Sequence, residues 1–280
     1  MPPTALLDRQ SYVMVAERSG NIGLGVFSMH GPVLETALRA ALDAGCILFD
    51  TAWKYGNERE VGALVPSSCQ VCTKICGTQY TGRKRFLYLD RKSIRKSVVQ
   101  AARKLNRPQI DIVLLHNVFR GYEQAFFDLI QVQKEGLVRE IGVSGYGVRQ
   151  LEAVKSHCGV YPEVCMLEVH PYHSSPEITA FCAENDIRVM ARSPFAHGQI
   201  LEELGREAIM QKLVASTGKN VPQIVLRWCV QHGWIAVPRS ADPDHIREDF
   251  DIFNFELSAD DMRAIDSLNR NQSYGVFIQK

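Results

Sequence analysis

Short apolar runs rich in β-branched residues alternate along this chain with longer amphipathic stretches. The eight runs cover residues 22–27, 47–52, 71–75, 110–116, 140–146, 164–170, 188–194 and 234–240. In the central runs, such as IDIVLL, apolar residues occupy both alternating faces, which is typical of strands that are covered on both sides. The alternation therefore predicts a parallel sheet whose strands are connected by helices.

The stretches between the runs have apolar residues at helical spacing. They cover residues 33–44, 91–105, 122–134, 148–157, 175–185 and 221–232. Glycine follows three of them, at the position that commonly ends a helix: Gly45, Gly136 and Gly233. Eight strands in a chain of 280 residues favour a closed (β/α)8 TIM barrel, and we expect one such α/β domain over residues 1–280.

An open, doubly wound sheet is the alternative architecture, and it would need a glycine-rich dinucleotide fingerprint. The candidate glycines are Gly20, Gly23 and Gly25, which have neither the G-x-G-x-x-G spacing nor a strand-then-helix context. The sequence therefore favours the barrel. The longest expected loop covers residues 76–90 and follows the third strand, at the end of a barrel where functional loops lie.

Composition excludes several classes of function. Lys and Arg number 32 against 31 acidic residues, so bulk charge predicts neither a nucleic-acid partner nor a membrane surface. We see neither a membrane span nor a signal peptide, and expect a cytoplasmic monomer with reduced cysteines. The spacing of Cys69, Cys72 and Cys76 loosely resembles a metal site, but no fourth ligand is obvious and we expect no metal.

Polar residues follow the second, third and fourth strands at the end where barrel enzymes carry their chemistry. They are Asp50, with Tyr55 a short turn later, then Lys74 and His116. A lone Asp there is often a helix cap and a lone His is often a bystander, but four such groups from adjacent strands indicate a site. Lys74 can pair with Asp50 and is expected to lower the pKa of Tyr55, a usable general acid. Neutral His116 can polarise a substrate oxygen.

At this point the sequence resembles the aldo-keto reductase family. The stretch LDAGCILFDTAWKYGNEREVG, residues 42–62, is similar to the best-known signature of that family. Later blocks follow in the family's order: LLHN, IGVSGYG, EVHPYH, ARSPFAHG and VPRSADPDHIRED. The resemblance implies a (β/α)8 barrel that binds a nicotinamide coenzyme, usually NADPH, without a Rossmann fold. It also implies hydride transfer to an aldehyde or ketone substrate.

Carried over position by position, the resemblance implies a catalytic set of Asp50, Tyr55, Lys74 and His116. Tyr55 would donate the proton, Lys74 paired with Asp50 would lower its pKa, and His116 would bind the substrate oxygen. The coenzyme set implied for NADPH/NADP+ comprises Gly25, Val26, Asp50, Ser144, Gly145, Glu168, Arg192, Ser193, Pro194, Phe195, Arg239, Ser240, His245, Glu248 and Asp249. The substrate positions implied are Phe27, Trp53 and Asn117.

Within the coenzyme set, Ser144 and Glu168 match positions that hold the carboxamide. Arg239 and Ser240 match the pair that receives the 2′-phosphate, and a guanidinium beside a hydroxyl suits that group. NADPH is therefore expected to bind more tightly than NADH. The residues that match the pyrophosphate loop and the adenine contact are Ser193, Pro194, Phe195 and Glu248.

Four positions depart from the family pattern. Gly145 and Asp249 stand where the family commonly has Asn, and His245 stands where it commonly has Arg. Arg192 replaces an aromatic residue that stacks on the nicotinamide. A guanidinium plane can also stack, but it would repel the cationic oxidised ring and so favour the reduced coenzyme.

Two alternative functions remain open at this stage. The first is an NAD(P)-dependent aldose dehydrogenase, because residues 76–90 and GVSGYG resemble sugar dehydrogenases of the same superfamily. The second is a non-catalytic subunit that senses nicotinamide nucleotides, against which the intact set Asp50, Tyr55, Lys74 and His116 argues.

Overall fold

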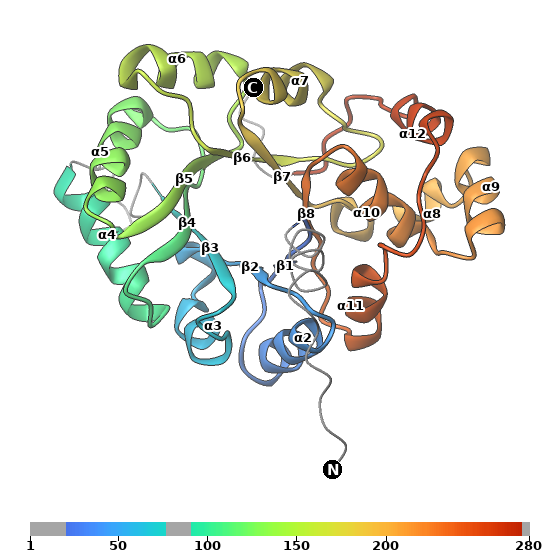
Figure 1. Ribbon diagram of the computed structural model, residues 1–280, viewed down its shortest axis with the longest axis horizontal. Helices are drawn as coiled ribbons and strands as arrows, with labels where there is room; N and C mark the ends of the chain where they lie inside the picture. The colour runs from blue at the N-terminus through green and yellow to red at the C-terminus, as the bar shows by residue number, and fades with distance from the viewer. Residues whose placement is uncertain (1–20, 77–90, 276–280) are drawn as a thin grey trace, which may run out of the picture.

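A parallel barrel of eight strands forms the centre of the molecule. The computed structural model describes residues 21–76 and 91–275. Neighbouring strands pair in sequence order, from β1 to β8. A parallel bridge between Ile22, two residues before β1, and Ala236 in β8 brings the two edges of the sheet together and closes the barrel (Figure 1). The predicted (β/α)8 architecture is confirmed, whereas residues 77–90 of the expected long loop lie outside the described residues.

Each of the eight predicted runs corresponds to one strand. Most strands are shorter than their runs, but β3 begins one residue and β5 two residues before the predicted start. The strands are β1 (Leu24–Gly25), β2 (Leu48–Asp50), β3 (Gln70–Ile75), β4 (Ile110–Leu115), β5 (Val138–Ser144), β6 (Val164–Glu168), β7 (Arg188–Arg192) and β8 (Ile235–Val237). The polar residues that end several runs are thereby placed at the strand ends or just beyond them.

Helices surround the strands on the outside of the barrel (Figure 1). Six match the predicted stretches: α2 (Gly31–Asp43), α4 (Arg91–Lys104), α5 (Tyr122–Lys134), α6 (Val148–Cys158), α7 (Pro176–Glu184) and α10 (Val221–Gln231). The sequence analysis missed α3 (Glu58–Leu64), α8 (Leu201–Leu204), α9 (Ala208–Thr217), α11 (Pro243–Phe250) and α12 (Ala259–Asp266). Most of these are too short to show a clear helical period, although Asp242 and Ser258 cap α11 and α12.

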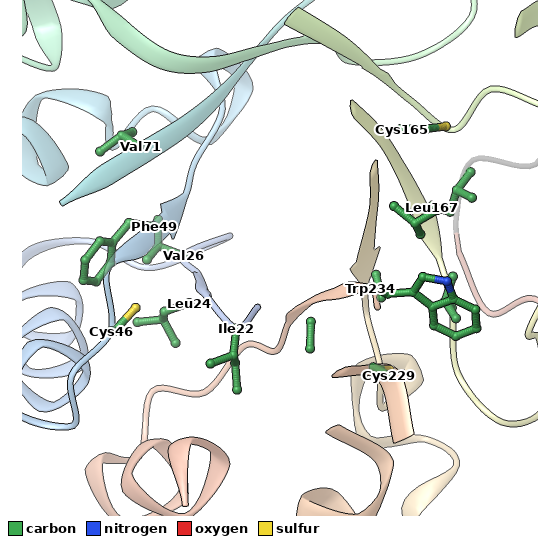
Figure 2. Close-up of a cluster of buried hydrophobic side chains, with 14 of the residues drawn as sticks. Ile22, Leu24, Val26, Cys46, Phe49, Val71, Cys165, Leu167, Cys229 and Trp234 are labelled. Atoms are coloured by element: carbon green, nitrogen blue, oxygen red, sulfur yellow. The ribbon is translucent and has the colours of Figure 1, made fainter. Parts of the chain in front are cut away.

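Alternate residues of the strands form two apolar layers. The outward side chains pack against the helices, and Figure 2 shows part of this layer, including Leu24, Phe49 and Val71. The inward side chains form a separate cluster inside the barrel: Leu48, Cys72, Ile112, Leu114, Val164, Met166, Met190, Ile235 and Val237. The period of two along each strand keeps these layers apart.

A ring of polar side chains follows the inner apolar layer toward the carboxyl ends of the strands. Each member lies two residues after an inward-facing position, as Asp50 follows Leu48 and Lys74 follows Cys72. The polar ring comprises Asp50, Lys74, His116, Ser144, Glu168 and Arg192. Strand periodicity therefore delivers these groups from six neighbouring strands to one end of the barrel.

Close packing between strands gives the first testable prediction. A Cβ atom at Gly142 in β5 would lie 2.2 Å from the backbone oxygen of Val164 in β6. We expect Gly142→Ala to lower the free energy of unfolding by about 1–3 kcal/mol, because strand backbone must shift to admit the methyl group. Denaturant unfolding measures this change.

Gly205→Ala is the matched control, since the added Cβ would meet nothing closer than 3.4 Å and the backbone there is helical. It should change stability by less than about 0.5 kcal/mol. Equal stability of the two variants would contradict the packing argument.

Candidate active site

A buried ion pair joins the first two members of the polar ring. Lys74 Nζ lies 2.5 and 2.7 Å from the two carboxylate oxygens of Asp50, and it donates to Thr51 O at 2.9 Å. The side chains of Lys74 and Asp50 are only 2% and 7% exposed. Burial alone would lower the pKa of Lys74, but the charge of Asp50 raises it above its ordinary value. The ammonium therefore keeps its charge inside the barrel.

Tyr55 lies against this pair. It ends the short helix η1 (Trp53–Tyr55), and Gly56 terminates that helix in the left-handed conformation, with φ of 77°. Lys74 Nζ lies 3.4 Å from the phenolic oxygen and 5.0 Å from the centre of the ring. The arrangement of the three side chains thus agrees with the predicted set.

The net pKa of Tyr55 differs from the expectation. Burial raises the pKa of the phenol above its ordinary value, and Asp50 adds to the rise, while Lys74 opposes both. The expected direction of the Lys74 effect is correct, but the expected net lowering is wrong because burial outweighs the ammonium and Asp50 cancels part of its charge. The phenol therefore carries its proton at neutral pH, which is the state a proton donor needs.

His116 follows β4 and faces Tyr55 edge to face, with ring centroids 6.0 Å apart. Burial and then the charges of Lys74, Lys54 and Arg192 lower the pKa of this imidazole to about 3. The ring is consequently neutral at physiological pH and carries one N–H. The Cys76 thiol lies 3.5 Å from Nδ1, a neighbour that the sequence analysis had grouped only with a doubtful metal motif.

The sequence analysis also missed Asn57, whose side chain links the segment that carries Tyr55 to the loop that follows β1 by hydrogen bonds. Its side-chain oxygen accepts from Thr51 Oγ1 at 2.6 Å, and its amide donates to Val26 O at 2.8 Å and Met29 O at 3.0 Å. The signal was present, because Asn57 lies in the signature block just after Tyr55. Its role depends on backbone oxygens from another loop, which spacing alone does not reveal.

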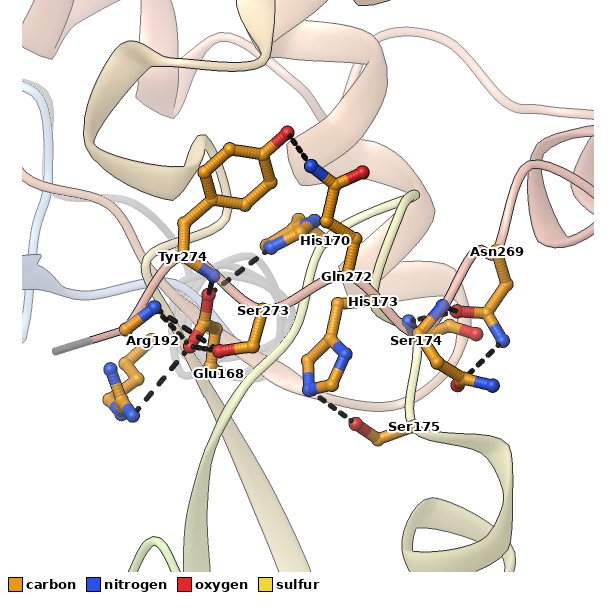
Figure 3. A network of polar contacts seen from close by, with 12 residues as sticks. Glu168, His170, His173, Ser174, Ser175, Arg192, Asn269, Gln272, Ser273 and Tyr274 are labelled. Atoms are coloured by element: carbon orange, nitrogen blue, oxygen red, sulfur yellow. Dashed lines mark hydrogen bonds and ion pairs between the residues drawn. The ribbon is translucent and has the colours of Figure 1, made fainter. Parts of the chain in front are cut away.

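The C-terminal segment contacts Glu168, another member of the polar ring (Figure 3). Ser273 Oγ, Tyr274 N and Gly275 N donate to the Glu168 carboxylate at 2.7, 2.7 and 2.9 Å. Arg192, the neighbour of Glu168 in register, has its guanidinium 4.0 Å away and is 28% exposed. Glu168 was expected to face a coenzyme, yet here its partners come from its own chain.

Other predicted coenzyme residues lie at the junction of β1 and β8. Gly25 N donates to Pro238 O at 2.8 Å, and a Cβ atom at Gly25 would lie 3.3 Å from that oxygen. Exposed Arg239 uses Nε to donate to Phe27 O at 2.6 Å, next to the backbone of Val26. No partner among the described residues is seen for the terminal guanidinium nitrogens of Arg239, which could therefore bind an anion.

The predicted adenine and phosphate positions lie before and within α11. Ser240 Oγ accepts from Asp242 N at 3.1 Å, in the turn that begins the helix. His245 and Glu248 are exposed, and Asn220 donates to Glu248 at 2.9 Å. Asp249 is buried, and burial followed by the Glu248 charge raises its pKa to about 7.

The remaining coenzyme positions follow β5 and β7. Ser144 is buried at the end of β5, and Gly145 follows it, exposed, in the left-handed region with φ of 73°. Ser193, also left-handed, begins the loop that continues through Pro194 and Phe195. The predicted set therefore includes Arg192 and Arg239, whose positive charges suit the phosphates of a dinucleotide, together with several carboxylates.

The three predicted substrate positions lie close to Tyr55 and His116. The ring of Phe27 is 46% exposed, and its centroid lies 4.9 Å from that of Tyr55. Trp53 is half-buried at the start of η1, and exposed Asn117 directly follows His116. Within residues 21–76 and 91–275, no group of three or more potential ligands is arranged to hold a metal.

Comparison with known proteins identifies the family. The model of the Aldo/keto reductase family matches residues 21–270. The chain belongs to the aldo/keto reductases. The resemblance seen in the sequence is thereby confirmed, as is the expected activity of an oxidoreductase that reduces carbonyl compounds.

The helices of the described portion include none long and apolar enough to cross a membrane.

Several named aldo/keto reductases are similar over most of their length. "2,5-diketo-D-gluconic acid reductase B" of Corynebacterium sp. (strain SHS752001) is 37% identical over 260 residues, which cover 89% of each chain. "Methylglyoxal reductase DkgA" of Escherichia coli (strain K12) is 29% identical, with 91% of each chain covered. The structure of a Gox0644 mutant in complex with NADPH has a TM-score of 0.78 at 28% identity, and 89% of each chain is covered.

The low pKa of His116 predicts that kcat/KM for carbonyl reduction does not change with the titration of this histidine near neutral pH. Protonation near pH 3 leaves the imidazole neutral at every higher pH. We expect kcat/KM for carbonyl reduction, measured at saturating coenzyme, to show no inflection from a histidine between about pH 5 and 8, where an ordinary imidazole titrates. A tenfold fall centred on about pH 6.5 would contradict the assignment of a neutral His116.

Proposed function

We propose that this chain is a single-domain, NADPH-dependent carbonyl reductase in which Tyr55 is the general acid. The observation that carries the proposal is the buried ion pair of Lys74 and Asp50, whose ammonium lies 3.4 Å from the phenolic oxygen. The neutral ring of His116 packs edge to face against that phenol, with the two ring centroids 6.0 Å apart. The proposed proton donor thus contacts both the charged side chain that would stabilise its phenolate and the proposed hydrogen-bond donor.

Each residue has a distinct part in the proposed reaction. The bound reduced nicotinamide supplies the hydride. Tyr55 gives its proton to the carbonyl oxygen as that oxygen gains electrons, and Lys74 stabilises the phenolate that remains. Asp50 keeps Lys74 charged and in place. His116 donates its N–H to the same oxygen and orients the carbonyl group.

The coenzyme residues proposed lie at the carboxyl end of the barrel strands and in the loops that follow them. Arg239 and Ser240 would hold the 2′-phosphate, with His245, Glu248 and Asp249 toward the adenine. Ser144 and Gly145 would lie near the carboxamide, and Arg192 near the ring. The loop Ser193, Pro194 and Phe195 would cover the pyrophosphate, and Gly25, Val26 and Asp50 would line the inner wall.

The proposed substrate is a small polar aldehyde or ketone bound among Phe27, Trp53 and Asn117. Two relatives named for a diketo sugar acid and for methylglyoxal support this substrate class. Lys54 and Arg192, which act on His116, add positive charge that favours an electron-rich substrate. We further propose a cytoplasmic monomer, a location that suits the eight free cysteines.

Removing the phenolic hydroxyl tests the mechanism. Tyr55→Phe should lower kcat at least about a hundredfold, because the proton donor is lost while the ring remains. The dissociation constant for NADPH, followed by fluorescence titration, should change little. Tyr122→Phe, a half-buried tyrosine on α5, is the control and should keep full activity. Full activity of Tyr55→Phe would remove the proposed mechanism.

Coenzyme selectivity tests the role of Arg239. NADPH should bind more tightly than NADH to the unmodified protein. Arg239→Gln should weaken NADPH binding about tenfold to a hundredfold, since a hydrogen bond to a charged group contributes about 1.5–3 kcal/mol. NADH binding should hardly change.

Arg263→Gln on α12 is the matched control for Arg239→Gln, because that arginine pairs with Asp260 and lies outside the proposed site. Titration of both variants with both coenzymes gives the comparison. Equal losses of NADPH and NADH affinity in Arg239→Gln would show that this side chain does not bind the 2′-phosphate.

A further inference from the structure

The Glu168 carboxylate is fully occupied by partners from its own chain. Oε2 accepts from Ser273 Oγ at 2.7 Å and from Gly275 N at 2.9 Å. Oε1 accepts from Tyr274 N at 2.7 Å and from His170 Nε2 at 3.3 Å. A carboxylate offers about four lone-pair positions, so these four donors use its whole capacity.

Residues 269–272, which precede the residues that bind Glu168, also contact the loop that follows β6. Tyr172 O accepts from Arg270 N and from Gln272 N, each at 3.1 Å. The Arg270 guanidinium lies 4.0 Å from the centre of the Tyr172 ring, and Asn269 accepts from Ser174 N at 3.2 Å. The contacts with Glu168 therefore end a continuous seam between the C-terminal segment and the loop that follows β6 (Figure 3).

Close approach at Gly275 shows how specific the contact is. A Cβ atom there would lie 2.4 Å from Glu168 Oε2 and 3.4 Å from an Arg192 guanidinium nitrogen. A larger residue would require either the Glu168 carboxylate or the backbone to shift. Glycine at position 275 therefore favours this close approach.

A nicotinamide carboxamide and the C-terminal segment cannot both donate to Glu168. Binding of the carboxamide N–H would require loss of a hydrogen bond to a buried carboxylate, and such bonds are among the stronger ones in proteins. Among the described residues, by contrast, no hydrogen bond is seen between the C-terminal segment and Ser144. The partner of Ser144 in register on β6 is Met166, whose thioether has no hydrogen-bond donor. The polar ring thus offers Ser144, not Glu168, to the carboxamide.

We propose that Glu168 is a positioning residue that anchors residues 273–275 across the end of the barrel and stays bound to them when the coenzyme binds. The negative charge of Glu168 also balances the positive charge of Arg192, its neighbour in register, which lies beside the proposed nicotinamide position. The assignment replaces the coenzyme contact that the family resemblance implied for Glu168. The part of this proposal that concerns the coenzyme rests on the proposed function, whereas the part that concerns residues 273–275 does not.

Hydrogen exchange of the Tyr274 and Gly275 amides tests the anchor directly. In the unmodified protein these amides should be protected, and saturating NADPH should leave them protected. Faster exchange on adding NADPH would overturn the proposal, because it would mean that the coenzyme takes Glu168 from the segment. Absence of any NADPH binding would count against the proposed function instead.

Two variants separate the roles of the carboxylate. Glu168→Gln and Ser273→Ala should both accelerate exchange at Tyr274 and Gly275, even without coenzyme. Ser267→Ala, a serine whose hydroxyl donates to Ala264 O, is the matched control and should leave exchange unchanged. Unchanged exchange in both test variants would overturn the anchor.

Binding titrations complete the test. Neither test variant should change the NADPH dissociation constant by more than about threefold, since neither removes a coenzyme contact. Glu168→Gln should weaken NADP+ relative to NADPH by about two- to tenfold, because Arg192 then lacks its counter-charge; Ser273→Ala should not. A loss of NADPH affinity above about tenfold in Glu168→Gln alone, or an unchanged NADP+/NADPH ratio, would overturn the proposal.

Discussion

The buried ion pair between Asp50 and Lys74 is the interaction on which the active end of the barrel depends. An ammonium with 2% exposure is tolerated only with a partner and satisfied hydrogen bonds, and Asp50 and Thr51 O provide both. The pair places charge next to Tyr55, and the same ammonium helps to keep His116 neutral. One electrostatic arrangement thus acts on the protonation states of both Tyr55 and His116.

The two carboxylates of the polar ring serve different ends. Asp50 faces a single cation and transmits its effect to the proposed chemistry through Lys74. Glu168 accepts four hydrogen bonds. Burial would raise the pKa of its carboxyl group, but hydrogen bonds from His170, Ser273 and Tyr274 N and the charge of Arg192 outweigh burial and lower this pKa to about 2. Asp50 keeps Lys74 charged beside Tyr55, whereas Glu168 binds residues 273–275 of the C-terminal segment.

Prediction from the sequence succeeded where a local period governs structure. The runs of alternating or continuous apolar residues located all eight strands, and long amphipathic stretches such as α2 and α10 were found. It failed for α3 and α8, of seven and four residues, because tertiary packing rather than periodicity stabilises so short a helix. α11 was missed although Asp242 gave a capping signal that could have revealed it.

By itself, the sequence determined that Asp50, Lys74 and His116 reach the same end of a barrel, because side chains alternate along each strand and parallel strands share their carboxyl ends. Only the tertiary structure decided that Tyr55 has a net raised pKa, because burial from several elements outweighs one charge. It also decided that Ser273 binds Glu168 from 105 residues away, a contact that no local period encodes.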